Sequence, residues 1–202
     1  MSERSRALTI ILALAVPAPG CGSDPLTGPS DIPVTFSGRV VDYRTQSPAA
    51  AVVVRLGPLV ESDFSPSEAT TNGYGRYVVT VPRTTTFTVS VDGVFAGTAR
   101  INGRAYRGDL FIRGGTCIAR YGIVIDSRSL QPIQGAMLTL TGMTTTSGAD
   151  GWYRIDLGCP DVVLPGGTTF INVSHPDYQA RTQVVGRGVA GVSRLDLDLE
   201  RR

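Results

Sequence analysis

Few side chains in this sequence could carry chemistry, and their spacing offers no catalytic constellation. His175 is the only histidine among 202 residues, and it stands before Pro176 at the end of an apolar run. A serine nucleophile would need that histidine as its base, and no Gly-x-Ser-x-Gly sequence is present to expose one. Cys117 and Cys159 lack the paired spacing of a zinc site. We therefore expect no catalytic residue, no metal site and no cofactor.

Acidic residues raise a calcium hypothesis, but their spacing favours turns and strand faces instead. Asp150 and Asp156 flank a turn and a short apolar segment without the dense alternating oxygens of a calcium loop. Asp196, Asp198 and Glu200 alternate with leucines near the C-terminus. This alternation predicts a last strand with one wet, acidic face, a soluble edge that resists pairing with another chain.

The first twenty residues predict an export signal. Arg4 and Arg6 precede the apolar run 7–16, and ten helical residues rise about 15 Å, half of a bilayer's hydrocarbon core. A basic start before a short apolar run is the signal-peptide pattern. The following Ala18-Pro-Gly-Cys21 resembles the lipobox of bacterial lipoproteins, where a small residue precedes an invariant Cys. The resemblance implies that Cys21 is diacylated and anchors the mature protein to a membrane; the alternative is cleavage near Ala18, which releases a soluble protein.

Cysteine arithmetic agrees with an acylated Cys21. An exported protein with three cysteines leaves one unpaired, and acylation of Cys21 would leave Cys117 and Cys159 as a pair. A bridge between them would close a loop of about 43 residues and contribute about 4 kcal/mol in the chain-entropy model. Strictly alternating strands would put the two cysteines at opposite edges of the module, so a bend at 158–160 would be needed. Two buried thiols are the alternative.

Beyond the leader, the chain is a tether followed by a duplication. Residues 21–33 are rich in Pro, Gly, Ser and Asp without periodicity, which predicts a flexible tether. The segment 38–42 (Gly-Arg-Val-Val-Asp) recurs 84 residues later at 122–126 (Gly-Ile-Val-Ile-Asp), the length of a small sandwich domain. We expect one module at 34–113 and a second at 117–202.

Period-two alternation of apolar residues dominates both modules. Val52, Val54 and Leu56 alternate with Val53 and Arg55, and the corresponding Ala136, Leu138 and Leu140 alternate in the same way in the second copy. No run beyond residue 20 shows convincing helical periodicity. The sequence thus predicts an all-β fold, two tandem seven-stranded β-sandwiches.

The motifs that repeat resemble a known family. Gly-x-Val-x-Asp, a polar loop, a Pro-x-x-Gly-Ala segment at 132–136 and Asp150-Gly-Trp-Tyr153 are similar to the carboxypeptidase regulatory-like domain. The second module matches nearly throughout, whereas in the first Asp-Gly has become Tyr74-Gly75 and Gly-Ala has become Ala51-Val52. The resemblance implies a transthyretin-like (prealbumin-like) sandwich that serves as a non-catalytic accessory unit, and such a fold does not define an activity.

Charge and exposed aromatics narrow the class of partner. The formal net charge is +2, carried by Arg because Lys is absent, which is far from the basic excess of a nucleic-acid-binding protein. If Tyr153 points inward, Trp152 and Arg154 point outward, and Tyr178 and Tyr74 lie in nearby loops. These four form a candidate surface for a sugar ring or a protein. The alternative is that Trp152 covers the neighbouring module.

Together these observations predict a non-catalytic, lipid-anchored protein of the bacterial cell envelope, on its periplasmic or surface side. Its partners would be the membrane, through Cys21, and an envelope protein or a polysaccharide. The leading hypothesis is a structural or protein-interaction module. The alternative is a carbohydrate-binding accessory lipoprotein that uses exposed aromatics such as Trp152.

Overall fold

Every regular element in the described part of the chain is a β-strand. The computed structural model describes residues 33–59, 65–81, 85–101, 107–159, 168–187 and 191–202. These residues hold fifteen strands and no helix, so the all-β prediction is confirmed for them. The leader, Cys21 and the tether up to residue 32 lie outside the described residues. In chain order the strands are β1 (Val34–Asp42), β2 (Val53–Pro58), β3 (Ser67–Thr70), β4 (Arg76–Val81), β5 (Thr85–Val91), β6 (Val94–Ile101), β7 (Leu110–Ile112), β8 (Ile118–Asp126), β9 (Met137–Leu140), β10 (Met143–Thr146), β11 (Trp152–Gly158), β12 (Thr168–Ser174), β13 (Arg181–Arg187), β14 (Gly191–Leu195) and β15 (Leu197–Leu199).

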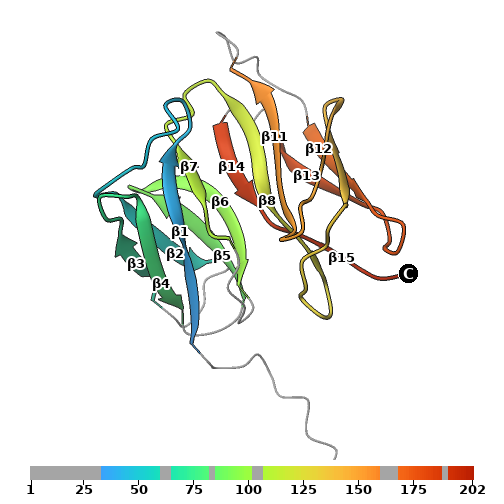
Figure 1. Ribbon diagram of the computed structural model, residues 1–202, viewed down its shortest axis with the longest axis horizontal. Coiled ribbons are helices and arrows are strands. Elements are labelled where there is room, and N and C mark those ends of the chain that lie inside the picture. Colours follow the sequence, from blue (N-terminus) through green and yellow to red (C-terminus); the bar gives the residue numbers. More distant parts are fainter. Residues whose placement is uncertain (1–32, 60–64, 82–84, 102–106, 160–167, 188–190) are drawn as a thin grey trace, which may run out of the picture.

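The strands form three sheets, one of which runs through both halves of the molecule (Figure 1). The first half has a three-stranded sheet in the order β4-β1-β7, and the second half has a four-stranded sheet in the order β10-β9-β12-β13. The large sheet runs β11-β8-β14-β6-β5-β2-β3 and carries β15 beside β8. One continuous sheet therefore supplies a layer to a sandwich in each half.

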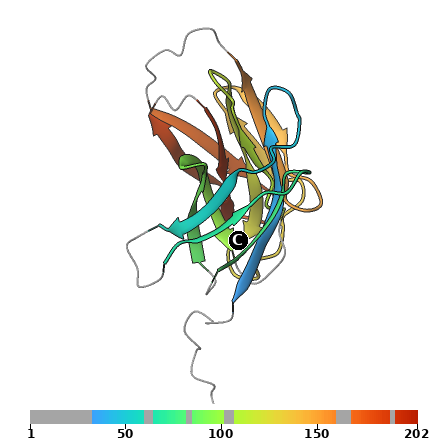
Figure 2. The ribbon, with the colours of Figure 1, turned by 90° about the vertical axis from the view of Figure 1, so that its left-hand side faces the viewer.

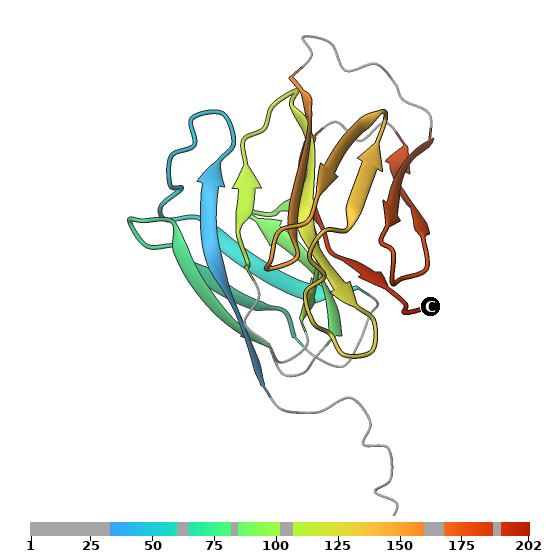
Figure 3. The same ribbon diagram turned by 45° about the vertical axis from the view of Figure 1, so that its right-hand side comes forward.

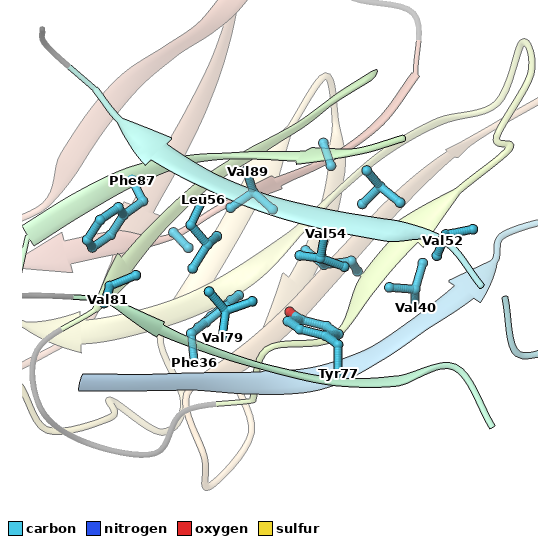
Figure 4. Close-up of a cluster of buried hydrophobic side chains, with 14 of the residues drawn as sticks. Phe36, Val40, Val52, Val54, Leu56, Tyr77, Val79, Val81, Phe87 and Val89 are labelled. Atoms are coloured by element: carbon cyan, nitrogen blue, oxygen red, sulfur yellow. The ribbon is translucent and has the colours of Figure 1, made fainter. Parts of the chain in front are cut away.

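Alternation along the strands builds the core of the first half. Val54 and Leu56 of β2 are fully buried, and Val79 and Val81 of β4 lie in the opposite layer (Figure 4). The predicted inward face of β2 is confirmed, because its alternate residue Arg55 is exposed. Burying such side chains contributes about 25 cal/mol per Å² of apolar surface, which is the main stabilising contribution in a small sandwich.

The second core uses the corresponding positions. Leu138 and Leu140 of β9 are buried, as are Tyr153 and Ile155 of β11 and Ile171 of β12. The residues that face inward in the two halves therefore occupy corresponding positions of the repeat, as the sequence predicts. Figure 2 presents the first half to the viewer, and Figure 3 brings the second half forward.

The duplication extends to individual hydrogen bonds. The Thr71 hydroxyl donates to Ala49 O over 2.8 Å and accepts from Val52 N, which closes the loop after β1. In the second half the Ser147 hydroxyl donates to Ile133 O over 2.6 Å and accepts from Ala136 N. Each hydroxyl is buried and bridges two backbone groups that no strand partner satisfies.

An additional strand resolves the geometry of the two cysteines. The sequence predicts three alternating strands from Cys117 to Cys159, whereas the short β10 makes β11 the fourth strand of the second half. As a result β11 pairs antiparallel with β8, and Gly158 lies opposite Ile118. The cysteines therefore meet at one edge and form a disulfide, and the register of β11 shifts between Asp156 and Gly158, where Gly158 has a φ of 92°.

The prediction of a wet, acidic last strand is wrong. The chain breaks at Asp196 into β14 and β15, and β14 lies between β8 of its own half and β6 of the first half. The Asp196 side chain is 3% exposed, and Asp198 is paired with Arg100 and Arg181. A run of alternating Leu and Asp is compatible with an exposed edge, but here Asp196 pairs with Arg194 of β14, and Asp198 pairs with arginines of β6 and β13.

Candidate functional site: the junction between the two halves

The junction is built around a third buried cluster, separate from the two cores. Its members come from both halves: Tyr43, Phe111, Cys117, Ala119 and Tyr121, with Val41, Trp152 and Val192 packed against them. Parallel pairing of β14 with β6 places Arg194 opposite Gly97 and Leu195 opposite Thr98. The two halves are therefore joined by backbone hydrogen bonds as well as by apolar packing.

Arg194 occupies the centre of this junction, with a fully buried side chain. Its Nε lies 3.0 Å from Asp196 Oδ1, and its Nη1 donates to the carbonyls of Arg107 and Asp109 in the first half, over 2.8 and 3.2 Å. Burial lowers the pKa of the guanidinium, but Asp196 and the surrounding tyrosines more than offset this and raise it. Arg194 is thus charged and satisfies two edge carbonyls of the three-stranded sheet.

Asp196 is held in place from both halves as well. Its Oδ2 accepts from Arg100 N of β6 over 2.9 Å, and its Oδ1 accepts from Ile123 N of β8 over 3.2 Å. A buried carboxylate is costly unless it is paired and hydrogen-bonded, and here it is both. The pair links β6, β8 and the edge of β7 through two side chains.

An equivalent pair stands in the first half. Arg107 and Asp109 lie at the positions that match Arg194 and Asp196, 87 residues earlier in the chain. Asp109 Oδ1 accepts from Arg39 N over 3.1 Å, as Asp196 accepts from Ile123 N. Arg107 is 46% exposed, however, and its ion pair of 2.7 Å lies at a sheet edge. The Arg-x-Asp ion pair is therefore partly solvated in the first half and buried in the second half.

The glycine of the repeated Gly-x-Val-x-Asp motif packs against the backbone of the Arg-x-Asp segment in each half. A Cβ on Gly38 would come within 2.3 Å of the Gly108 backbone, and one on Gly122 within 2.1 Å of Leu195 O. Tyr77 donates its hydroxyl to Gly108 O, and Tyr153 donates to Leu195 O. Only glycine lets the first strand of each half approach the Arg-x-Asp strand this closely.

Aromatic rings seal the junction. Tyr121 accepts a hydrogen bond from Phe111 N over 3.0 Å, and the two rings meet edge-on with centroids 4.9 Å apart. Complete burial raises the pKa of Tyr121 to about 12, so it stays neutral. Tyr43 donates its hydroxyl to Asp156 of the second half, and burial together with that carboxylate raises its pKa.

The prediction that Trp152 is an exposed platform is wrong. The ring is partly buried at the junction, 5.7 Å from the Tyr121 ring, and the Arg107 guanidinium covers it at 4.4 Å. The Arg194 guanidinium also lies over the Trp152 ring, 5.6 Å from the ring centroid. Trp152 therefore packs between the two halves, as in the alternative that the sequence left open. It does so because β14 pairs with β6 and brings the first half over the side of β11 on which Trp152 lies.

The other three candidate surface residues do not gather around Trp152. Arg154 is half-buried, pairs with Asp156 and stacks over the Tyr43 and Phe111 rings at 4.8 and 4.9 Å. Tyr178 is 7% exposed in the second core and donates to Asp126, so its predicted place on a surface is wrong. Tyr74 is 74% exposed in the turn before β4. The four share no binding surface.

A groove opens at one end of the junction. It has a volume of about 460 Å³ and lies between the β5–β6 turn, the end of β7 and the start of β14. Val94 and Phe95 are exposed on its wall, and Arg113 and Asp92 lie at its margin. The pairing of β6 with β14 covers only Gly97 and Thr98, so the two strands diverge before these residues and leave the gap.

The described residues provide little for catalysis. They hold no group of three or more His, Cys, Asp or Glu side chains arranged for a metal ion. His175 Nδ1 accepts from Asp177 N and lies beside the Tyr178 ring. No helix in the described part of the chain is long and apolar enough to cross a membrane.

Comparisons with known proteins give distant structural likeness only. Neither a known protein family nor a curated protein matches the sequence, so the carboxypeptidase regulatory-like resemblance stays a prediction. The streptococcal ancillary pilin is 14% identical, with a TM-score of 0.31 over 84% of this chain and 62% of its own length. The TIE protein of Bacillus anthracis is 8% identical, with a TM-score of 0.29 over 84% and 34%. The shaft pilin SpaA from Lactobacillus rhamnosus GG is 12% identical, with a TM-score of 0.33 over 84% and 97%.

The chain thus spans less than two thirds of the first two of these proteins. Scores at this level carry no argument about function, and the fold rests on the strands and contacts described above.

Sequence reasoning missed Arg194 and Asp196 as the residues that organise the junction. A signal was present, because Arg107-Gly-Asp109 recurs as Arg194-Leu-Asp196. The repeat indicates a shared local structure. It does not indicate which copy would be buried, since that depends on where the neighbouring half lies.

Proposed function

We propose that this protein is a non-catalytic, lipid-anchored structural or protein-interaction module of the bacterial cell envelope. The observation that carries the proposal is the insertion of β14 between β8 and β6, closed by the buried Arg194–Asp196 pair. Two sandwiches joined in this way move as one body, which suits a spacer or a platform that holds a partner at a defined distance. Flexible linkage would have left the halves free to reorient.

The anchor belongs to the part of the chain before residue 33. The short apolar run and the Gly20-Cys21 pair support an acylated N-terminus, and the segment 22–33 supports a tether between acyl group and β1. We expect Cys21→Ser to release the protein from membranes and to remove incorporated fatty acid. Retention of both by the variant would overturn the lipid anchor and leave the folded part of the proposal untouched.

The junction groove supports the protein-interaction side of the proposal. Phe95 lies next to the two-residue turn at Asp92-Gly93, so its backbone N–H and C=O point away from β5. Val192 lies at the matching register of β14 and pairs with Ala119 of β8, and the pairing of β14 with β6 begins only at Arg194. The walls of the groove are therefore two strand edges, and an extended segment of a partner protein fits between them.

Site-specific photo-crosslinking in the native cell tests this interaction. A photoreactive residue in place of Phe95 should give one discrete adduct in the membrane fraction. The matched control is the same residue in place of Val78, which is also 62% exposed but lies on β4. Equal labelling at both positions, or none at Phe95, would argue against a partner in the groove.

A further inference from the structure

Part of the outer surface of the four-stranded sheet in the second half has no charged side chain among the described residues; it runs from β10 across to the middle of β13, and Arg187, which is paired with Thr168 at the end of β13, lies outside it. Its outward side chains come from all four strands and alternate with the buried residues of the second core. We call this surface the threonine face. Its members are Met137, Thr139, Thr144, Thr146, Phe170, Asn172, Ser174, Thr182 and Val184.

A straight row of hydroxyl and amide groups crosses the threonine face. Thr144 lies opposite Thr139, Thr139 opposite Asn172, and Asn172 opposite Thr182. The Thr139 and Thr144 hydroxyls are 3.3 Å apart, and the Thr182 hydroxyl donates to Asn172 Oδ1 over 2.7 Å. Neighbouring strands lie about 4.8 Å apart, so the row repeats at a spacing close to the length of one hexose unit. The Asn172 amide donor and further hydroxyl lone pairs remain available for a ligand.

Apolar side chains flank the row. Phe170 is 46% exposed and stands opposite Val184, which is 56% exposed, while Met137 is 48% exposed on the other side. An aromatic ring beside neutral hydrogen-bonding groups is the combination that meets a sugar, whose ring has an apolar C–H face and a polar rim.

The first half carries a charged pair at the corresponding place. Arg55 of β2 and Glu68 of β3 stand directly opposite each other, and both are exposed. Their counterparts in the second half are Thr139 and Thr144, which also stand opposite each other. An opposite-charge cross-strand pair is an ordinary solvated feature of a sheet. The exposed charged pair of the first half is thus replaced by an uncharged pair in the second half, and this pair continues into the row across Asn172 and Thr182.

We propose that the threonine face binds an uncharged, extended polysaccharide laid across the four strands, with Phe170 against one sugar ring. Hydroxyl-rich neutral chains can both donate to and accept from Thr and Asn side chains, whereas the members of the threonine face offer an anionic polymer no countercharge. The proposal goes beyond a structural or protein-interaction role. It uses neither the junction groove nor Trp152, and so it stands or fails separately from the proposed function.

Affinity electrophoresis of the full mature chain in detergent tests the proposal. The probes are a soluble β-linked glucan, a soluble α-linked glucan, a galactomannan and the anionic polymer polygalacturonate. At least one neutral polymer should retard the protein while polygalacturonate does not. Retardation by polygalacturonate alone, or by none of the four, would overturn the proposal.

Two variants locate the binding, and one matched variant controls for charge. Phe170→Ala with Asn172→Ala should weaken retardation at least about tenfold, since it removes one stacking surface and one amide donor. Thr139→Arg with Thr144→Glu places the charged pair of the first half on the threonine face and should also weaken retardation at least about tenfold. Arg55→Thr with Glu68→Thr makes the reverse change on the first half and should leave binding as it was. Unfolding midpoints of all three must equal that of the parent.

Self-association is the competing use of the same face. Sedimentation equilibrium of the parent and of the Thr139→Arg, Thr144→Glu variant distinguishes it. A parent that dimerises, with a monomeric variant and no retardation by any neutral polymer, would reassign the face to contact with a second copy and overturn the proposal.

Discussion

Arg107 and Asp109 in the first half lie at a sheet edge, whereas Arg194 and Asp196 in the second half lie in the middle of the large sheet. The local structure is the same in both, down to the backbone N–H that each aspartate accepts. What differs is the neighbour, because β6 of the first half pairs with β14, whereas the edge at 107–109 meets two side chains of the second half, those of Arg194 and Trp152. The same local motif is therefore partly solvated at the margin of the junction in one half and fully buried at its centre in the other.

Removing the carboxylate from each pair tests this contrast most severely. Asp196→Ala strips the countercharge from a buried guanidinium and should lower the free energy of unfolding by about 5 kcal/mol. Asp109→Ala breaks a partly solvated pair and should cost about 1 kcal/mol. Urea denaturation followed by fluorescence of Trp152, the single tryptophan and a junction residue, measures both. Equal losses would mean that the two pairs are energetically alike.

The disulfide is a support that the described residues show only in the second half. Cys117 and Cys159 are separated by 42 residues, and Cys117→Ala with Cys159→Ala should cost about 4 kcal/mol in the chain-entropy model. Intact mass before and after reduction should differ by about two hydrogens, which confirms the starting state. A loss below about 1 kcal/mol would show that pairing of β8 with β11 holds this edge without the bridge.

The buried hydroxyls offer a test in which the two halves should agree. Thr71→Val and Ser147→Ala each remove a hydroxyl that bridges two backbone groups, so each should cost about 2 kcal/mol. Thr71→Ser and Ser147→Thr keep the hydroxyl and serve as controls. A cost confined to one half would indicate that the repeat is a likeness of shape without equal energetics.

Acid stability gives the smallest and most selective contrast. The Ser129 N–H, Arg201 and Tyr178 hold the pKa of Asp126 well below its usual range. The pKa of Asp42 is also lowered, mainly by hydrogen bonds from backbone N–H groups of its own turn. A carboxylate with a lowered folded pKa contributes stability above its unfolded value of about 4, and loses that contribution as the pH falls. We therefore expect Asp126→Asn to flatten the fall in stability between about pH 4 and pH 2 more than Asp42→Asn.

Denaturation curves recorded at intervals from about pH 6 to pH 2 measure this difference. Tyr178→Phe is the matched control, because it removes one partner of Asp126 and leaves the carboxylate in place. If the slope of stability against pH is the same in the parent and in Asp126→Asn, the network around Asp126 contributes nothing that the simpler turn around Asp42 lacks.

Much of the fold could be predicted because it follows from local pattern. Val54, Leu56, Leu138 and Leu140 alternate with polar residues, and that period forces one face of each strand inward. The candidate surface around Trp152 could not be predicted in the same way. Alternation correctly placed Trp152 on the face opposite Tyr153, but whether that face meets water or another half depends on contacts far along the chain.

The extra strand β10 shows the same limit at shorter range. Its sequence, Met-Thr-Thr-Thr, has no clear apolar alternation, and it becomes a strand because its backbone pairs with β9. That pairing reverses the direction of β11 and brings Cys159 to Cys117.

The sequence by itself determined the all-β architecture, the duplication and the inward face of the main core strands, because these depend on side-chain period and on turn residues close in the chain. Tertiary structure alone decided which Arg-x-Asp pair is buried, where Trp152 packs and which sheet face stays open. Those outcomes depend on how the large sheet joins the halves, and burial is a property of what lies opposite a residue in space.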